Sequence, residues 1–184
     1  MNLIMNPLSI RIPKHTLVLM CGVQNSGKTT FLKENFPSEN ILCNDDILSN
    51  IVKSNPEYDF YKATFAVQDY LTEKISSMGI SGKNVVLDAI GFTNEERFGI
   101  ILRFNEFFNK IIQIVVHPNL TTVLERPKKP ILPYHKKLNM RNPTSNEIKS
   151  FWNIIQSNIK DGSIAVGTDV TYILSHTDNV SVSF

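Results

Sequence analysis

The chain has 184 residues, of which 42% are hydrophobic, and a formal net charge of +2. This length and apolar content favour one domain with a sizeable core, and the net charge is too small to mark a nucleic-acid-binding protein. Two cysteines, Cys21 and Cys43, are too few and too widely spaced for a zinc site, so buried free thiols are the simplest interpretation.

The N-terminal residues 1–14, MNLIMNPLSIRIPK, carry no positive charge before their apolar residues and have a proline among them. They resemble neither a signal peptide nor a membrane span. We therefore expect a protein of a reducing, cytoplasmic compartment with no membrane partner. High Asn, Ile and Lys usage is typical of an AT-rich genome, and the compartment would be the host cytoplasm if that genome is viral.

Five apolar runs predict strands, at residues 16–21, 41–43, 84–89, 110–117 and 170–174. They are continuous rather than alternating, as is typical of parallel strands buried on both faces. After the second run, apolar residues repeat at helical spacing from Phe60 to Met78, and Gly79 and Gly82 are expected to close that helix. This spacing favours a core position for Phe60 over the alternative, an aromatic stacking surface formed with Tyr58 and Tyr61.

Two further helices are predicted from their starting residues, because Thr93 to Glu96 and Thr144 to Glu147 both fit the capping box. The second of these helices is expected to place Trp152 on its apolar face. Alternating strands and helices predict one doubly wound α/β domain over residues 1–184, with helices on both faces of a parallel sheet. The last residues, 175–184, fit either an edge strand or a frayed tail.

Residues 22–29, GVQNSGKT, follow the first apolar run directly and precede a helical pattern. This is the strand, loop and helix context that a phosphate-binding loop requires, which disfavours a chance glycine-rich turn. In such a loop backbone N–H groups face phosphate oxygens, Lys28 reaches the β and γ phosphates, and the Thr29 hydroxyl can bind Mg²⁺. We therefore expect ATP and Mg²⁺ as cofactors. The candidate nucleotide-binding residues are Gly22, Asn25, Ser26, Gly27, Lys28, Thr29 and Thr30.

Acidic residues follow two of the predicted strands. Asp45 and Asp46 come just after the 41–43 run, at the edge where an open α/β sheet binds ligands. Asp45 is our candidate for the group that orients an acceptor hydroxyl and takes its proton, and Asp46 for the cap of a helix that begins at Ile47. Asp88, in the 84–89 run, is a candidate Mg²⁺ ligand, although such a residue often only caps a turn.

The segment from residue 126 to 143 is basic and contains no acidic residue. Its prolines exclude a long helix, and a solvated surface is the simplest interpretation. In a kinase, however, such a segment can form a lid, with Arg126 stabilising charge on the γ phosphate in the transition state. Lys128 or Lys129 would assist. The basic residues are Arg126, Lys128, Lys129, Lys136, Lys137 and Arg141.

From Ile12 to about Trp152 the chain resembles the polynucleotide 5′-hydroxyl kinases of phages and of bacterial RNA-repair enzymes, within the P-loop kinases. The resemblance rests on the loop at 22–29, the pair Asp45-Asp46, Asp88 followed by Glu96-Arg97, and Leu124-Glu125-Arg126. It implies that Lys28 and Thr29 hold ATP and Mg²⁺, that Asp45 is the general base on a 5′-hydroxyl, and that Arg126 is a lid arginine contacting phosphates.

The chain departs from this family at two positions. Leu48 stands where the family has an arginine on the acceptor side, and Ile90-Gly91 stand where a Thr-Asn pair often follows the strand-end aspartate. Both changes leave the ATP side intact. Three hypotheses follow: a kinase acting on the 5′-hydroxyl of a single-stranded DNA or RNA end, a kinase for a small metabolite or modified nucleoside, which Leu48 favours, and a nucleotide-dependent binding module.

Overall fold

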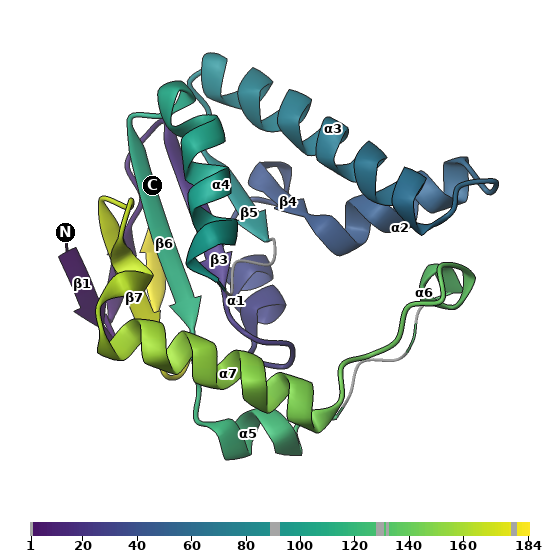
Figure 1. The fold of residues 1–184 in the computed structure, drawn as a ribbon. Coiled ribbons are helices and arrows are strands. Elements are labelled where there is room, and N and C mark those ends of the chain that lie inside the picture. Colours follow the sequence, from purple (N-terminus) through teal and green to yellow (C-terminus); the bar gives the residue numbers. More distant parts are fainter. Residues whose placement is uncertain (1, 89–92, 128–130, 132, 178–179) are drawn as a thin grey trace.

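The computed structural model describes residues 2–88, 93–127, 131, 133–177 and 180–184 (Figure 1). A six-stranded sheet in the order β1-β7-β6-β3-β5-β4 forms its centre, and all of its pairs are parallel. A separate parallel pair is formed by β2 and β8. The strands are β1 (Asn2–Met5), β2 (Ser9–Arg11), β3 (Thr16–Cys21), β4 (Ile41–Cys43), β5 (Val85–Asp88), β6 (Lys110–Val116), β7 (Val170–Leu174) and β8 (Ser181–Ser183).

Helices connect these strands, so the predicted α/β fold with a parallel sheet is confirmed. Both predicted capping boxes form: the Thr93 and Thr144 hydroxyls each accept from the backbone N–H of the glutamate three residues later. The α-helices are α1 (Lys28–Asn35), α2 (Asn44–Ser54), α3 (Phe60–Ile80), α4 (Asn94–Phe104), α5 (Leu120–Glu125), α6 (Pro133–Lys137) and α7 (Ser145–Lys160).

The central strand β3 packs on both of its faces. Side chains alternate across a strand, so Leu17, Leu19 and Cys21 point to one face and Val18 and Met20 to the other. The first face is covered by α3, α4 and α7, and the second by α1 together with the β2 and β8 pair. Figure 1 shows α4 and α7 lying across the sheet. Because both faces are buried, β3 reads in the sequence as an unbroken apolar run.

The two ends of the chain lie together. β1 pairs with β7, and β2 pairs with β8, although the sequence predicted no strand before residue 16. The side chain of Asn6 accepts hydrogen bonds from the backbone N–H and the hydroxyl of Ser175, each at 2.8 Å. Of the two interpretations of the last residues, the edge strand is right for Ser181–Ser183.

Three details of the helices differ from expectation or refine it. Helix α3 runs past Gly79, where a methyl group would lie only 2.8 Å from the Phe107 side chain, and Gly82 follows the helix in a left-handed conformation. Phe60 is 43% exposed, so its prediction as a core residue is wrong: it is the first residue of α3, and burial on this face begins at Ala63. Trp152 packs partly buried against the cluster under α7, as expected.

No helix in the described part of the chain combines the length and apolar content needed to cross a bilayer.

Candidate functional site

The loop between β3 and α1 turns so tightly that it requires glycine. Gly22 has φ +147° and Gly27 has φ +106°, both in the region that favours glycine, and Asn25 between them has φ +65°. A methyl group on Gly22 would overlap the backbone oxygen of Val116 and lie 2.8 Å from the Ser26 hydroxyl. The backbone is therefore drawn in against β6, and its positive φ angles suit the tight turn of a phosphate-binding loop.

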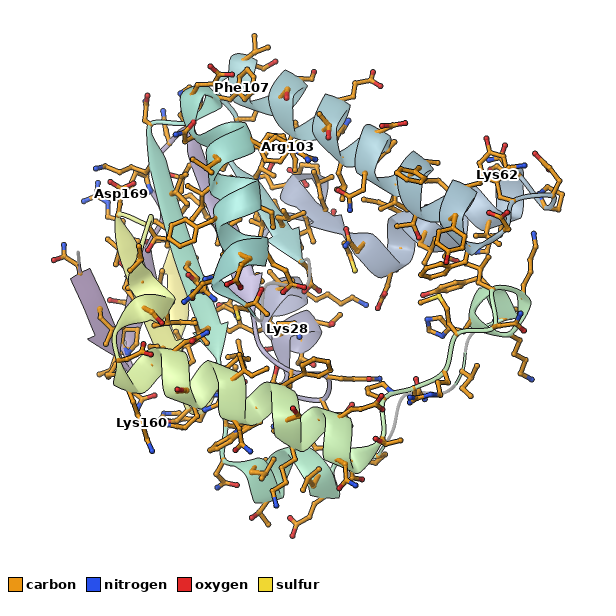
Figure 2. The ribbon with its side chains drawn as sticks, viewed as in Figure 1. Lys28, Lys62, Arg103, Phe107, Lys160 and Asp169 are labelled. Carbon is orange, nitrogen blue, oxygen red and sulfur yellow. The ribbon has the colours of Figure 1, made fainter. Side chains whose placement is uncertain are left out.

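Lys28, the first residue of α1, folds back over this loop. Its amine donates hydrogen bonds to the backbone oxygens of Gly22 at 2.5 Å and Val23 at 3.2 Å. Figure 2 shows Lys28 near the carboxyl ends of the central strands. A flexible ammonium in this place can exchange backbone oxygens for phosphate oxygens, since it carries three donors.

The hydroxyl residues of the loop differ in exposure. Ser26 is 2% exposed, and its hydroxyl makes no hydrogen bond in the described part of the chain. Thr29 lies half-buried in the first turn of α1, and Thr30 is exposed beside it. A buried polar atom without a partner beside this loop fits an oxygen-rich ligand such as a phosphate.

Parallel pairing brings the acidic residues to the same edge. In the registers of the sheet Asp88, the last residue of β5, lies opposite Met20 of β3 on one side and Cys43 of β4 on the other. Neighbouring strands are about 4.8 Å apart. Asp88 therefore stands between the strand that leads into the loop and the strand that leads to Asp45.

Asp45 and Asp46 are both exposed in the first turn of α2. This helix begins at Asn44, with Cys43 in the capping position and no side-chain cap, so the prediction that Asp46 caps a helix starting at Ile47 is wrong. The chain becomes helical as soon as β4 ends, so both aspartates are in the first turn of α2, at the positive end of the helix dipole. Burial raises the pKa of the Cys43 thiol to about 11, although backbone N–H groups of this turn partly offset the effect.

Arg126 also contacts the loop at 22–29. It follows α5 directly, and its Nη1 donates to the backbone oxygen of Asn25 at 2.7 Å. The same atom lies 3.2 Å from the place that a methyl group on Gly27 would take. Arg126 and the loop are thus in contact across 101 residues of sequence.

Helix α6 of the basic segment lies against α2 and α3. Lys128 and Lys129 lie outside the described residues. Figure 1 shows α6 below α2 and away from α7, and Tyr134 of α6 packs with Leu138, Val52 and Ala63 in one apolar cluster. Arg141 is engaged elsewhere, because its guanidinium bonds both oxygens of Glu147 at 2.7 Å and holds the pKa of that carboxyl well below its usual range.

Tyr134 is a residue of this region that the sequence did not single out. It is 5% exposed, and its hydroxyl has no hydrogen-bond partner among the described residues. Burial raises its pKa, and electrostatic interaction with Asp45, Cys43 and Asp46 raises it further. Its ring packs in an apolar cluster with Val52 of α2, and Leu48 of the same helix packs against that cluster. A tyrosine in a proline-rich segment gives no periodic signal from which such a position could be predicted.

Metal binding here would depend on the nucleotide. The described residues contain no group of three or more His, Cys, Asp and Glu side chains that could hold an ion alone. Mg²⁺ commonly binds through one or two protein oxygens and substrate phosphates. Thr29 at the loop and Asp88 at the end of β5 have the oxygen chemistry for this mode.

A surface cavity of about 600 Å³ lies elsewhere in the fold. Its lining includes Lys14, Lys74, Lys83 and Asn84. Lys14 comes shortly before β3, and Lys83 and Asn84 come just before β5, so the cavity is at the amino ends of the strands. Ligands of open α/β sheets bind at the carboxyl ends, so the loop edge remains the candidate site.

Comparisons with known proteins agree with this geometry. A family model described as an AAA domain matches residues 17–129. A chain of the "Structure of the Pnkp1/Rnl/Hen1 RNA repair complex" superposes with a TM-score of 0.60 at 15% identity, covering 82% of this chain and 47% of that one. Lower scores are found for a sugar kinase from Janibacter sp. HTCC2649 (TM-score 0.40, 14% identity, 83% and 96% covered) and for deoxyadenosine kinase from M. mycoides (TM-score 0.37, 14% identity, 88% and 90% covered). No curated protein matches the chain.

The chain thus spans about half the length of the RNA-repair chain that it superposes on, with 47% of that chain covered. At 15% identity this likeness concerns the fold alone. The family match covers the loop at 22–29 and the strands β3 to β6, apart from Thr16 at the start of β3. The chain therefore belongs to the AAA domain family, and it shares its fold with the chain from the RNA-repair complex.

Proposed function

We propose that this protein is an ATP-dependent kinase that transfers the γ phosphate to a hydroxyl, and that the hydroxyl is the 5′ end of a DNA or RNA strand. The observation that carries the proposal is the meeting of Lys28 and Arg126 at one loop, with Asp88 and Asp45 at the same edge of the sheet. Two cations and two carboxylates at one edge provide for both the donor and the acceptor of a phosphoryl transfer.

Each residue has a separate task in this mechanism. The loop N–H groups and Lys28 hold the β and γ phosphates, and Arg126 stabilises the charge that spreads over the γ oxygens. Thr29 and Asp88 would hold Mg²⁺, which when bound neutralises phosphate charge. Asp45 orients the acceptor hydroxyl and accepts its proton.

The transfer itself exchanges one bond for another. A bond forms between the acceptor oxygen and the γ phosphorus, while the bond from that phosphorus to the bridging β–γ oxygen breaks. The products are ADP and a phosphorylated acceptor, and the released proton passes to Asp45. The exposure of Asp45 leaves room for an acceptor to approach it.

A polynucleotide acceptor is supported by the resemblance of the motifs and by the RNA-repair structure named above. A small metabolite or nucleoside is the second candidate, and Leu48 is the observation that favours it. This side chain is half-buried in apolar surroundings one turn after Asp45, where the related kinases have a cation. An acceptor without phosphate needs no cation there.

The test is transfer of labelled γ phosphate from ATP, with Mg²⁺, to 5′-hydroxyl DNA and RNA oligonucleotides. We expect labelled 5′ ends with the wild type, loss of labelling in Lys28→Ala, and a fall of roughly 10²–10⁴-fold in Asp45→Ala. Asp46→Ala is the matched control, since it removes the neighbouring exposed carboxylate, and should retain activity within a few-fold. A wild type that binds ATP but labels neither polymer would exclude the polynucleotide acceptor.

A further inference from the structure

Tyr134 is held against α2 by apolar contacts. Its ring belongs to one cluster with Val52 of α2, Ala63 of α3 and Leu138, and Leu48 packs against that cluster. Leu48 and Val52 are four residues apart and so lie on one face of α2. The lid helix α6 therefore seats its only buried aromatic side chain, among the described residues, on this face.

The face on which Tyr134 is seated leads to Asp45. Leu48 follows Asp45 by three residues, so the two side chains are neighbours on the helix surface. Asp45 and Asp46 are in the first turn of α2, before Leu48. Lys137 of α6 donates a hydrogen bond to the backbone oxygen of Val52 in the second half of α2, at 3.5 Å. The Tyr134 ring thus packs on the face of α2 that carries Leu48, one turn after Asp45.

This hydroxyl lacks a partner of its own. It is buried, and it makes no hydrogen bond with any described residue, Asp45 and Asp46 included. A buried polar group left unpaired is costly, so buried hydroxyls are almost always bonded to protein, water or ligand. A neutral O–H on a ring that packs one turn from Asp45 is suited to donate to a ligand oxygen that lies near Asp45.

We propose that Tyr134 is an acceptor-binding residue: its hydroxyl donates a hydrogen bond to an oxygen of the acceptor, next to the hydroxyl that Asp45 binds. This inference rests on the proposed function. It gives the lid a task on the acceptor side in addition to the task of Arg126 on the ATP side. In this arrangement Leu48 packs against the cluster that holds the tyrosine ring and does not bind phosphate.

The alternative is that Tyr134 only anchors α6 by its ring. Tyr134→Phe separates the two roles, because phenylalanine keeps the ring in the apolar cluster and removes the hydroxyl alone. Tyr70→Phe is the matched control, since Tyr70 is 45% exposed on α3 and makes the same chemical change outside the site. A purely packing role predicts that the two variants behave alike.

The measurement is steady-state kinetics with a 5′-hydroxyl oligonucleotide and ATP, varied in turn, for the wild type and both variants. We expect Tyr134→Phe to lower kcat/KM for the oligonucleotide about tenfold, as fits a lost hydrogen bond, with the KM for ATP and the melting temperature unchanged. Tyr70→Phe should match the wild type in every quantity.

The outcomes separate this inference from the proposed function. An active wild type with equal kinetics in Tyr134→Phe and Tyr70→Phe overturns the acceptor role of Tyr134 and leaves the kinase standing. A loss that appears equally in the KM for ATP also overturns it, because the effect would then not be on the acceptor side. A wild type that phosphorylates no oligonucleotide overturns the polynucleotide acceptor, and the role of Tyr134 in binding one falls with it.

Discussion

Replacing Gly22 by alanine tests the geometry of the phosphate loop directly. The new methyl group would overlap the backbone oxygen of Val116 and lie 2.8 Å from the Ser26 hydroxyl, in a backbone with φ +147°. Holding a residue with a side chain in such a conformation costs about 1–3 kcal/mol, and forcing a methyl group into a packed site costs about 1–3 kcal/mol more. We therefore expect Gly22→Ala to lose about 4 kcal/mol of folding free energy.

Two other glycines provide matched controls. Gly82 has φ +70° and Gly99 lies in α4, and a methyl group on either would meet no heavy atom within 4 Å. Gly82→Ala should cost only the left-handed conformation, about 1–2 kcal/mol. Gly99→Ala should gain about 0.5–1 kcal/mol, because alanine suits a helix better than glycine.

The assays are thermal unfolding and ATP binding by calorimetry. At about 2–4 °C per kcal/mol for a chain of this size, Gly22→Ala should melt roughly 8–16 °C below the wild type. Its affinity for ATP should fall at least about tenfold, since the loop must open to admit the methyl group, whereas both controls should bind ATP normally. A Gly22→Ala protein that melts and binds ATP like Gly82→Ala would refute the argument that the loop is closed by its approach to β6.

Arg126→Gln removes the hydrogen bond to Asn25 and the charge at the γ phosphate, so phosphoryl transfer should slow by about 10²–10³-fold. Arg11→Gln, at an exposed position, is the control, and equal transfer rates in the two variants would contradict the role of Arg126. Burial raises the pKa of Cys43 from 9.0 to about 11. In a Cys21→Ala background, alkylation of Cys43 at pH 8 should therefore be about a hundredfold slower than that of an exposed thiol, and its rate should increase with pH up to about pH 11. A rate that levels off near pH 9 would refute the raised pKa. The pKa of this thiol is higher in the folded state than in the unfolded state. The thiol therefore stabilises the folded state below pH 9, and this contribution is lost as the pH rises toward 11.

Local signals in the sequence were read correctly. The loop at 22–29 is marked by glycines and by the strand before it, and the capping boxes at Thr93 and Thr144 are complete within four residues. Asp88 could be placed at the sheet edge because the apolar run ends there. Each of these features depends on neighbours in the chain, so no knowledge of the tertiary structure was required.

Features that depend on distant partners were missed. All four residues of β1 are exposed, so no burial pattern marked this strand, and its partner lies about 168 residues away. The cap predicted at Asp46 failed because β4 passes into α2 without a loop, which the residue types do not reveal. Tyr134 lies in a five-residue helix, too short for a period, and it packs against residues of α2 and α3 that are distant in the sequence.

The pairing of the two chain ends constrains when the fold can be completed. Residues 2–11 pair with residues 170–183, so the earlier segment must wait for partner strands that lie about 170 residues later in the chain. Contacts of such long sequence separation slow folding, and an unpaired strand is exposed to other chains meanwhile. The core around β3, β5 and β6 has its pairs within residues 16–116 and can form first. We infer that this nucleotide-binding centre assembles before the edge of the sheet is added, during synthesis as well as in refolding.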